Sequence, residues 1–310
     1  MRGGGRRPAP SFPGPRRRFR LRRGFPWPGR SGSPPWGRPP GCRSRESYPG
    51  IIASRTGGKW DIFYPIVERF RFDRGGGSPV VAAHRGASDR EPENSPAAFS
   101  RSVADGADMI ELDVRLSADG VPVVLHDERT GRTARENLRV DRCGSARLRR
   151  VRLKNGEPIP LLADVLDLVG GKVPLNLEVK VPGGMAAVRR ALGEARYPGE
   201  ILLSSGLREE CAAARSLLPE IPCGLVTGRP SASDIAFCLR HALPSIHPDH
   251  RRLTVLRIRK VLDSGLLLFP YTVDDPDLFL RLVGSGARGV FSNRAQTLRA
   301  AWRERNRGGG

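Results

Sequence analysis

The stretch Met109-Ile110-Glu111-Leu112-Asp113-Val114 places two carboxylates in a run of residues that otherwise suits a buried strand. Alternate side chains of a strand point to the same face of its sheet. Glu111 and Asp113 therefore share one face, while the three aliphatic side chains between and beside them share the other. The stretch predicts a strand that is apolar on one face and acidic on the other.

A second stretch, Pro174-Leu175-Asn176-Leu177-Glu178-Val179-Lys180, repeats this arrangement, with Glu178 and Lys180 on one face. An ionised carboxylate is costly to bury without a partner. The convergence of three carboxylates, Glu111, Asp113 and Glu178, indicates a bound hard cation, because such ions take oxygen ligands. The two stretches together indicate an enzyme.

From Pro79 onward, short apolar runs alternate with amphipathic segments, which is the pattern of repeated βα units. The expected strands are Val80–Ala83, Met109–Val114, Val121–Leu125, Leu175–Val179, Ile201–Leu203, Gly224–Val226, Ser245–His247, Leu267–Tyr271 and Gly289–Phe291. The expected helices are Pro96–Asp105, Leu161–Val169, Met185–Ala195, Glu209–Leu217, Ala232–His241, Thr254–Asp263 and Asp277–Leu282.

These elements predict an α/β fold, a (β/α)8 TIM barrel, for which about 220 residues suffice. A doubly wound open sheet is the competing prediction, but no G-x-G-x-x-G turn supports it. Nine candidate strands for eight places mean that one is peripheral or misassigned. The link from Val114 to Gly120 is too short for a crossover helix, so we expect a hairpin or an extended excursion there.

The charge of the chain is concentrated near its N-terminus. Residues 1–78 contain 18 Lys and Arg against four Asp and Glu, so they carry +14 of the net charge of +21. The first 50 residues contain ten Gly and eleven Pro without a regular apolar period, which predicts disorder. The interpretations left open are a disordered basic tail and an upstream region translated from a misassigned start codon. Arginine runs such as Arg16-Arg17-Arg18 allow weak contact with anionic membranes, whereas a specific nucleic-acid role is disfavoured.

We expect four segments along the chain. Residues 1–60 are the disordered extension, 61–78 a connecting segment, 79–300 the barrel domain and 301–310 a disordered tail. The five cysteines, an odd number without C-x-x-C spacing, favour buried thiols in a reducing compartment over a disulfide framework or zinc site; they are Cys42, Cys143, Cys211, Cys223 and Cys238. No apolar run reaches 18 residues, so we expect a cytoplasmic protein without a transmembrane segment.

The active site of a TIM barrel is built at the C-terminal ends of its strands. Reading those ends in chain order gives His84-Arg85, Glu111 and Asp113, His126-Asp127, Glu178 and Lys180, and Tyr271-Thr272. The carboxylates would hold a divalent cation, the Arg and Lys would bind an anionic substrate, and the two histidines would transfer protons near neutral pH. This set suits phosphodiester cleavage. His241, His247 and His250 fall outside the pattern and are predicted to be structural.

Seven motifs occur in the order and spacing of a known family. They are His84-Arg85-Gly86-Ala87-Ser88, Pro92-Glu93-Asn94-Ser95, Gly106-Ala107-Asp108-Met109-Ile110-Glu111-Leu112-Asp113-Val114, Asp119-Gly120-Val121-Pro122-Val123-Val124-Leu125-His126-Asp127, Ile159-Pro160-Leu161, Leu177-Glu178-Val179-Lys180 and Tyr271-Thr272-Val273. On these motifs, the chain between Val80 and Leu298 resembles the glycerophosphodiester phosphodiesterases.

The resemblance implies a TIM barrel that hydrolyses a small-molecule glycerophosphodiester to sn-glycerol 3-phosphate and an alcohol. It implies Ca²⁺ or Mg²⁺ at Glu111, Asp113 and Glu178. The implied acid–base pair is His84 and His126, although the resemblance does not decide which of them is the acid. The implied phosphate ligands are Arg85 and Lys180.

The same resemblance implies supporting and pocket residues. Glu93 would orient Arg85 or a histidine, with Asn94 beside it in the motif. Tyr271 and Thr272 would belong to the substrate pocket. Tyr271 stands where the family usually has Trp, and Gly206 stands where an aromatic residue is common, so a more open pocket is expected.

Two other functions stay open on the sequence alone. A phosphodiesterase for lysophospholipids or another bulky diester would suit the more open pocket. A non-catalytic binding protein on the same fold is disfavoured, because every residue of the predicted rim is present.

Overall fold

The computed structural model describes residues 52–56, 59–63 and 78–307. The predictions for residues 1–51 and 64–77, including most of the basic extension and the connecting segment, lie outside the described residues, as does Cys42. Strands β1 (Ile52–Thr56) and β2 (Lys59–Phe63) pair antiparallel, with Ile52 opposite Phe63. The structure therefore differs from the prediction of a structureless segment up to residue 60.

Eight parallel strands form the barrel, which confirms the predicted fold. They are β3 (Val80–Ala83), β4 (Met109–Leu116), β6 (Leu175–Val179), β7 (Ile201–Ser205), β8 (Cys223–Thr227), β9 (Ser245–Pro248), β10 (Leu267–Leu268) and β11 (Gly289–Ser292). Their order is β10-β9-β8-β7-β6-β4-β3-β11. The barrel closes where the backbone N of Arg288 donates to Leu268 and that of Phe291 donates to Pro270, each at 3.0 Å.

The ninth candidate strand is peripheral. Strand β5 (Pro122–Val124) pairs antiparallel with the end of β4, with Val114 opposite Val124, and lies outside the barrel order. The connection is a hairpin, one of the two forms expected from the short link. Gly120 takes the left-handed backbone conformation (φ 73°) in this turn, which glycine adopts without steric cost.

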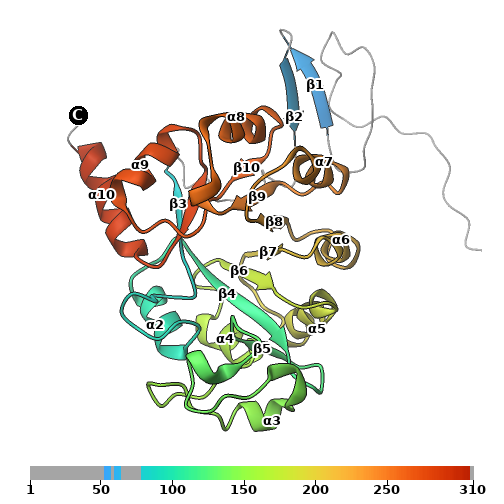
Figure 1. Cartoon of the computed structure of the whole chain (residues 1–310), viewed down its shortest axis with the longest axis vertical. Coiled ribbons are helices and arrows are strands. Elements are labelled where there is room, and N and C mark those ends of the chain that lie inside the picture. The colour runs from blue at the N-terminus through green and yellow to red at the C-terminus, as the bar shows by residue number, and fades with distance from the viewer. Residues whose placement is uncertain (1–51, 57–58, 64–77, 308–310) are drawn as a thin grey trace, which may run out of the picture. The chain divides into compact units, whose positions relative to one another are not determined.

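Helices cover the outside of the barrel, and Figure 1 shows α5, α6 and α7 as a column beside β6, β7 and β8. The helices are α2 (Pro96–Ala104), α4 (Leu162–Val169), α5 (Gly184–Ala195), α6 (Arg208–Leu217), α7 (Ala232–Arg240), α8 (Val255–Asp263), α9 (Pro276–Gly284) and α10 (Ala295–Arg307). All seven predicted helices are present. Ser95 caps α2 as its side chain accepts from the backbone N of Ala98 at 3.1 Å.

The prediction of a disordered tail at 301–310 is wrong for residues 301–307, because α10 continues to Arg307. The helix is held by buried Leu298 and by Trp302, whose ring lies 6.4 Å from that of Phe279 between centroids. The apolar residues of this segment follow a helical spacing inside an arginine-rich sequence. No helix in the described ranges is long and apolar enough to cross a membrane.

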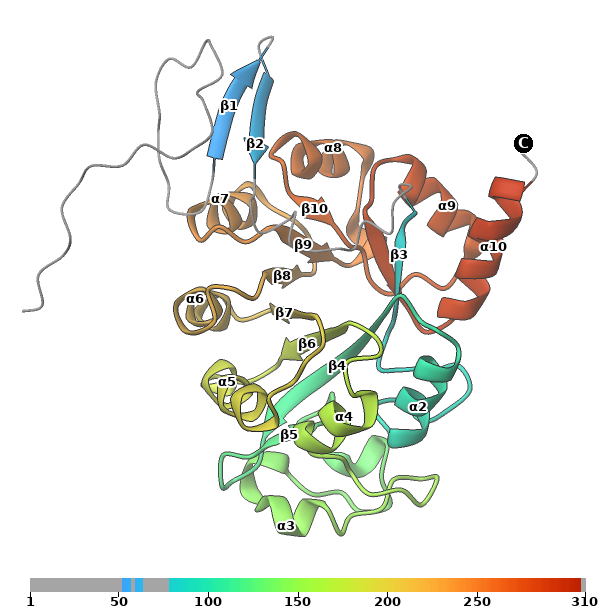
Figure 2. The ribbon, with the colours of Figure 1, turned by 180° about the vertical axis from the view of Figure 1, so that it is seen from behind.

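Between β5 and α4 the chain makes a long excursion, residues 125–161, beside the C-terminal end of β4 (Figures 1 and 2). It contains only short elements: η1 (Thr130–Arg132), η2 (Val140–Arg142) and α3 (Ser145–Leu148). Its apolar side chains form small clusters of their own, one of which joins Val140 and Leu148 to Val123 and Leu125. A further single turn, η3 (His250–Arg252), follows β9.

Apolar and acidic side chains alternate along β4 and point to opposite faces of the strand, as predicted. Ile110, Leu112 and Val114 are fully buried in the main core, which lies between the barrel and its helices. Glu111 and Asp113 are also buried, on the other face of the strand. Among the cysteines, Cys211, Cys223 and Cys238 are buried free thiols, and Cys143 is half-buried and free.

Candidate active site

Eight of the eleven predicted site residues line one cavity of about 190 Å³ at the C-terminal ends of the strands. They are His84, Arg85, Glu111, His126, Glu178, Lys180, Tyr271 and Thr272. Of the remaining three, Glu93 and Asp113 contact members of this lining, and Asn94 contacts Asp113. Five lining residues were not predicted as site residues: Asn176, Ser204, Val226, His247 and Phe291.

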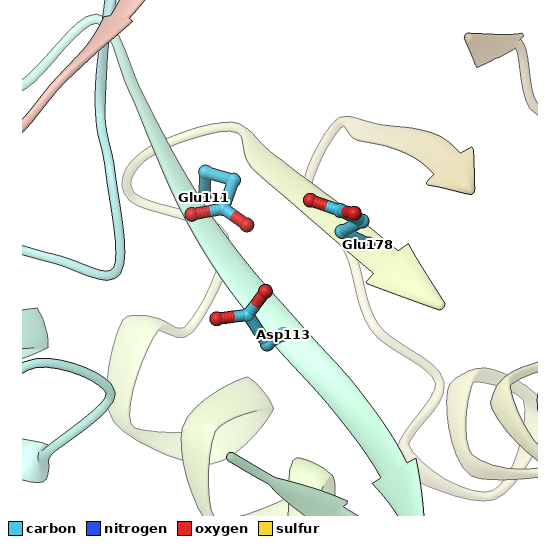
Figure 3. Close-up of side chains that lie close together, drawn as sticks. All are labelled: Glu111, Asp113 and Glu178. Carbon is cyan, nitrogen blue, oxygen red and sulfur yellow. The ribbon is translucent and has the colours of Figure 1, made fainter. Parts of the chain in front are cut away.

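The three acids form a compact cluster. Glu111 and Asp113 project from β4 and Glu178 from β6, and their carboxylates face one another (Figure 3). The pairing of the strands sets Asp113 directly opposite Glu178. One oxygen from each residue can be chosen so that all three lie within 4.8 Å of one another. The alternation read from the sequence is thus what brings the three acids together.

The donor set of this cluster fits a divalent cation. All three residues offer carboxylate oxygens, which hard cations prefer. Oε1 of Glu111 is buried and has no hydrogen-bond partner among the described residues, so it is available to a ligand. Burial, together with the charges of Asp113 and Glu178, raises the pKa of Glu111 well above its ordinary value. A bound cation would relieve this repulsion.

Two cationic side chains surround the acids. Nζ of Lys180 lies 3.0 Å from Oδ1 of Asp113 and 2.5 Å from Oε1 of Glu178. Nε of Arg85 lies 3.1 Å from Oδ2 of Asp113. Burial opposes the charge of Asp113, but Lys180 and Arg85 outweigh it and hold the pKa of Asp113 below its usual range. Burial by itself would lower the pKa of Lys180, but the charges of Glu178 and Asp113 outweigh burial. The pKa of Lys180 is therefore raised above its ordinary value.

A sharp turn after β3 aims Arg85 at the site. Arg85 itself has a positive φ of 59°, which is uncommon for a residue with a side chain. Its backbone N donates to Oε2 of Glu111 at 2.8 Å. The next residue, Gly86, has φ 84°, and a Cβ there would lie 2.7 Å from Cβ of Ala98 in α2. Only glycine allows the turn to pack this closely on the helix.

Glu93 and Asn94 do not line the cavity but hydrogen-bond to residues of the site. Oε1 of Glu93 accepts from Arg85 at 2.8 Å. Arg85 is one of the two partners that the family resemblance implied for Glu93. Asn94 is buried, and its side-chain amide donates to Oδ2 of Asp113 at 2.8 Å. Its Oδ1 accepts from the backbone N of Asp113 at 3.3 Å. These two residues therefore fix Arg85 and Asp113 instead of forming the cavity wall.

The partners of His84 fix its tautomer. Nδ1 of His84 lies 2.8 Å from Oδ1 of Asn293. Nδ2 of Asn293 donates to Oδ2 of Asp274 at 2.8 Å, and because a carboxylate only accepts, the amide must turn its oxygen toward His84. His84 therefore carries its proton on Nδ1 and has a lone pair on Nε2. Burial and the neighbouring charge of Arg85 lower the pKa of His84 to about 4.

The environment of His126 is different. Its side chain is about one-third exposed, and Nδ1 lies 2.6 Å from Oδ1 of Asp127. Oδ2 of Asp127 accepts from Nε of Arg132 at 2.5 Å. The hydrogen bond from Arg132 lowers the pKa of Asp127 to about 2. Nδ1 of His126 thus faces a carboxylate, whereas Nδ1 of His84 faces a neutral amide.

His247 lies in the cavity lining, although the sequence suggested only a structural role. Its ring is buried, with Nε2 at 3.0 Å from Oγ of Ser245, and burial lowers its pKa to about 3. A Cβ at Gly224 would lie 2.3 Å from Nε2, so this glycine makes room for the ring. His241 packs on Phe237 instead, with ring centroids 4.4 Å apart. No sequence signal separates His247 from the other two histidines.

With this geometry established, comparison with known proteins identifies the class. A family model described as the glycerophosphoryl diester phosphodiesterase family matches residues 84–297. A glycerophosphodiester phosphodiesterase of Caldanaerobacter subterraneus subsp. tengcongensis is 31% identical over 232 residues, which cover 71% of this chain and 96% of the relative. One from Bacillus subtilis is 27% identical over 246 residues, which cover 69% and 83%.

Solved structures agree. An Oleispira antarctica phosphodiesterase, in complex with the product sn-glycerol-3-phosphate, superimposes with a TM-score of 0.69 at 26% identity, covering 72% of this chain and 96% of that one. The protein is an enzyme of the phosphoric diester hydrolase class. More narrowly, the chain belongs to the glycerophosphodiester phosphodiesterase family.

Proposed function

We propose that this enzyme hydrolyses glycerophosphodiesters to sn-glycerol 3-phosphate and an alcohol, with Ca²⁺ or Mg²⁺ held by Glu111, Asp113 and Glu178. The observation that carries the proposal is the meeting of three acids, two cationic side chains and two histidines around one cavity. Such a cation would polarise a phosphoryl oxygen and offset the charge that develops on it. The similar Oleispira antarctica phosphodiesterase, which was solved in complex with its product sn-glycerol-3-phosphate, supports the same product here.

Arg85 and Lys180 receive the phosphate in this proposal. Both line the cavity. Arg85 contacts Asp113 through Nε and Glu93 through Nη1, and Lys180 contacts Asp113 and Glu178. Among the described residues, these contacts leave Nη2 of Arg85 and the third N–H of Lys180 for an anion. The guanidinium group presents a planar fork that matches phosphate oxygens, and the ammonium group acts as a point charge. Glu93 keeps Arg85 in place, and Asn94 holds Asp113, the acid that both cationic groups contact.

The two histidines take opposite roles. Nε2 of His84 has a lone pair because its proton is on Nδ1, so His84 accepts the proton of the attacking oxygen. His126, whose Nδ1 is held by the carboxylate of Asp127, gives a proton to the leaving alcohol. A P–O bond to the attacking oxygen forms as the P–O bond to the alcohol breaks, and one proton is taken up for each one released. The attacking oxygen belongs to water or to a glycerol hydroxyl of the substrate. In the second case the alcohol leaves as a cyclic phosphate forms, and water then opens that ring to give sn-glycerol 3-phosphate.

Release of sn-glycerol 3-phosphate from a panel of diesters tests the proposal. Glycerophosphocholine should yield the product with Ca²⁺ or Mg²⁺ present and should yield little after dialysis against EDTA. A lysophospholipid in the same panel tests the bulkier alternative. Full activity in excess EDTA, or no sn-glycerol 3-phosphate from any diester, would overturn the proposal.

A further inference from the structure

Arg132, in the excursion after β5, binds two carboxylates that belong to different parts of the site. Its two terminal nitrogens donate to Oε2 of Glu93 at 2.6 Å and to Oε1 of Glu93 at 2.8 Å. Its Nε donates to Oδ2 of Asp127 at 2.5 Å. The planar guanidinium group is therefore shared between a paired contact on one acid and a single contact on the other.

Each of these acids continues to a group that we assign to the reaction. Oε1 of Glu93 also accepts from Arg85 at 2.8 Å. Oδ1 of Asp127 also accepts from Nδ1 of His126 at 2.6 Å. A continuous series of charged contacts thus runs from Arg85 through Glu93, Arg132 and Asp127 to His126. It connects two loops, because 39 residues separate Glu93 from Arg132.

We propose that Arg132 is a positioning residue that holds the phosphate-binding Arg85 and the proton-donating His126 in a fixed relation to each other. The inference rests on the proposed function, since it takes the roles of Arg85 and His126 from there. Arg132 does not line the cavity itself, so it acts on substrate only through Glu93 and Asp127. Proton transfer to a leaving oxygen requires the donor within hydrogen-bond reach, which makes the orientation of His126 critical.

A purely structural surface ion pair is the competing interpretation, since the side chain of Arg132 is 48% exposed. The backbone of its turn, however, is held without this side chain. The backbone N of Ala134 donates to Thr130 at 2.8 Å, and that of Arg135 donates to Arg152 at 2.9 Å. The two acceptors are also more sheltered than Arg132, with side-chain exposures of 19% for Glu93 and 31% for Asp127. Removal of the guanidinium group should therefore disturb the site more than the fold.

Arg132→Ala is the variant that tests this inference, and Arg129→Ala is its matched control. Arg129 immediately precedes the same turn and carries the same charge. Within the described part of the chain, the hydrogen bonds of its side chain go to Asn137, with Nε 2.9 Å from Oδ1. Loss of a group that orients a site residue typically lowers activity about 10–100-fold. We expect a decrease of that order in kcat for Arg132→Ala on glycerophosphocholine, and little change for Arg129→Ala. Melting temperatures of both variants should stay near that of the wild type.

Two measurements separate positioning from a general loss of charge. With a p-nitrophenol leaving group, which needs less protonation, the decrease caused by Arg132→Ala should be smaller. In a double-mutant cycle, Arg132→Ala should lower kcat less in an Asp127→Asn background than in the wild type, because residues that act through one another are not additive.

A readout independent of turnover keeps the inference separate from the proposed function. The ring-nitrogen NMR signals of His126 should shift in Arg132→Ala and stay in place in Arg129→Ala. If the wild-type protein released no sn-glycerol 3-phosphate, the proposed function would fail, while these signals would still report whether Arg132 orients His126. Unchanged His126 signals in Arg132→Ala, or equal loss of activity in Arg129→Ala, would overturn the positioning role.

Discussion

The Nδ1 atom of His84 lies 2.8 Å from the Oδ1 atom of Asn293, although 209 residues separate the two along the chain. The contact exists because β11, the last strand, pairs in parallel with β3, the first strand of the barrel. Asn293 follows β11 directly, just as His84 follows β3. The pairing of these two strands thus sets the tautomer of a histidine that begins the first motif.

Replacement of Asn293 should affect the reaction more than the fold. Asn293→Ala removes the acceptor of the Nδ1 proton, so the ring of His84 can rotate and Nε2 loses its fixed direction. We expect kcat to fall about 10–100-fold, the range typical of lost orienting partners. The control is Asp275→Ala, which removes the N-cap of α9 one residue after Asp274. It should lower the free energy of unfolding by about 1 kcal/mol and leave kcat near the wild-type value. A normal kcat in Asn293→Ala would contradict the assigned tautomer.

Glu111→Gln should make the metal-free protein more stable at neutral pH. Because burial and the neighbouring acids raise the pKa of Glu111 in the folded state, the folded protein binds this proton more tightly than the unfolded chain. Stability of the metal-free wild type should therefore fall as the pH rises from the ordinary carboxyl pKa toward the raised one. Glu111→Gln should lack this contribution to the pH dependence.

Thermal melts in EDTA across this pH range check the prediction, and exposed Glu220→Gln is the control. Addition of Ca²⁺ should raise the melting temperature of the wild type and of the control, and should have little effect on Glu111→Gln. A cation response in Glu111→Gln equal to that of the wild type would remove Glu111 from the ligand set.

The two histidines should respond differently to the leaving group. His84→Ala and His126→Ala should each lower kcat about 10²–10⁴-fold on glycerophosphocholine, as expected for a lost general base or acid. A p-nitrophenol leaving group should restore much of the activity of His126→Ala and little of that of His84→Ala. His241→Ala is the control, since that ring packs on Phe237 away from the cavity. Rescue of His84→Ala instead would reverse the two roles.

The sequence predicted the fold because the apolar alternation of the strands is local. Ile110, Leu112 and Val114 alternate with two acids, and this period alone defines the inner and outer faces of β4. The residues at the strand ends could be grouped because parallel strands of a barrel end at the same rim. The α10 helix was missed, since its apolar positions are few among arginines.

Two further supporting residues, Arg132 and Asn293, could not be predicted in the same way. Arg132 is one of many arginines in an excursion without regular period, and only the fold places it between Glu93 and Asp127. Asn293 becomes relevant only when the last strand meets the first. These residues act through contacts between distant parts of the chain, which a local pattern does not record.

Gly224, which packs against the cavity residue His247, and Gly206 offer a last, paired prediction. A Cβ at Gly224 would lie 2.3 Å from Nε2 of His247 and 2.6 Å from Oγ of Ser245, so Gly224→Ala must displace the buried ring or the strand. A Cβ at Gly206 would meet only the backbone oxygen of Val226 at 3.7 Å, an ordinary contact. Both changes add one methyl group, at the second residue of β8 and at the residue that follows β7.

We expect Gly224→Ala to lower the free energy of unfolding by about 1–3 kcal/mol, as overpacking typically does, and to raise KM as His247 moves into the cavity. Gly206→Ala should leave both quantities close to those of the wild type. Denaturant unfolding and steady-state kinetics on glycerophosphocholine measure the two effects. If Gly224→Ala is as stable and as active as Gly206→Ala, then His247 has room to move, and its fixed position is not required for the shape of the cavity.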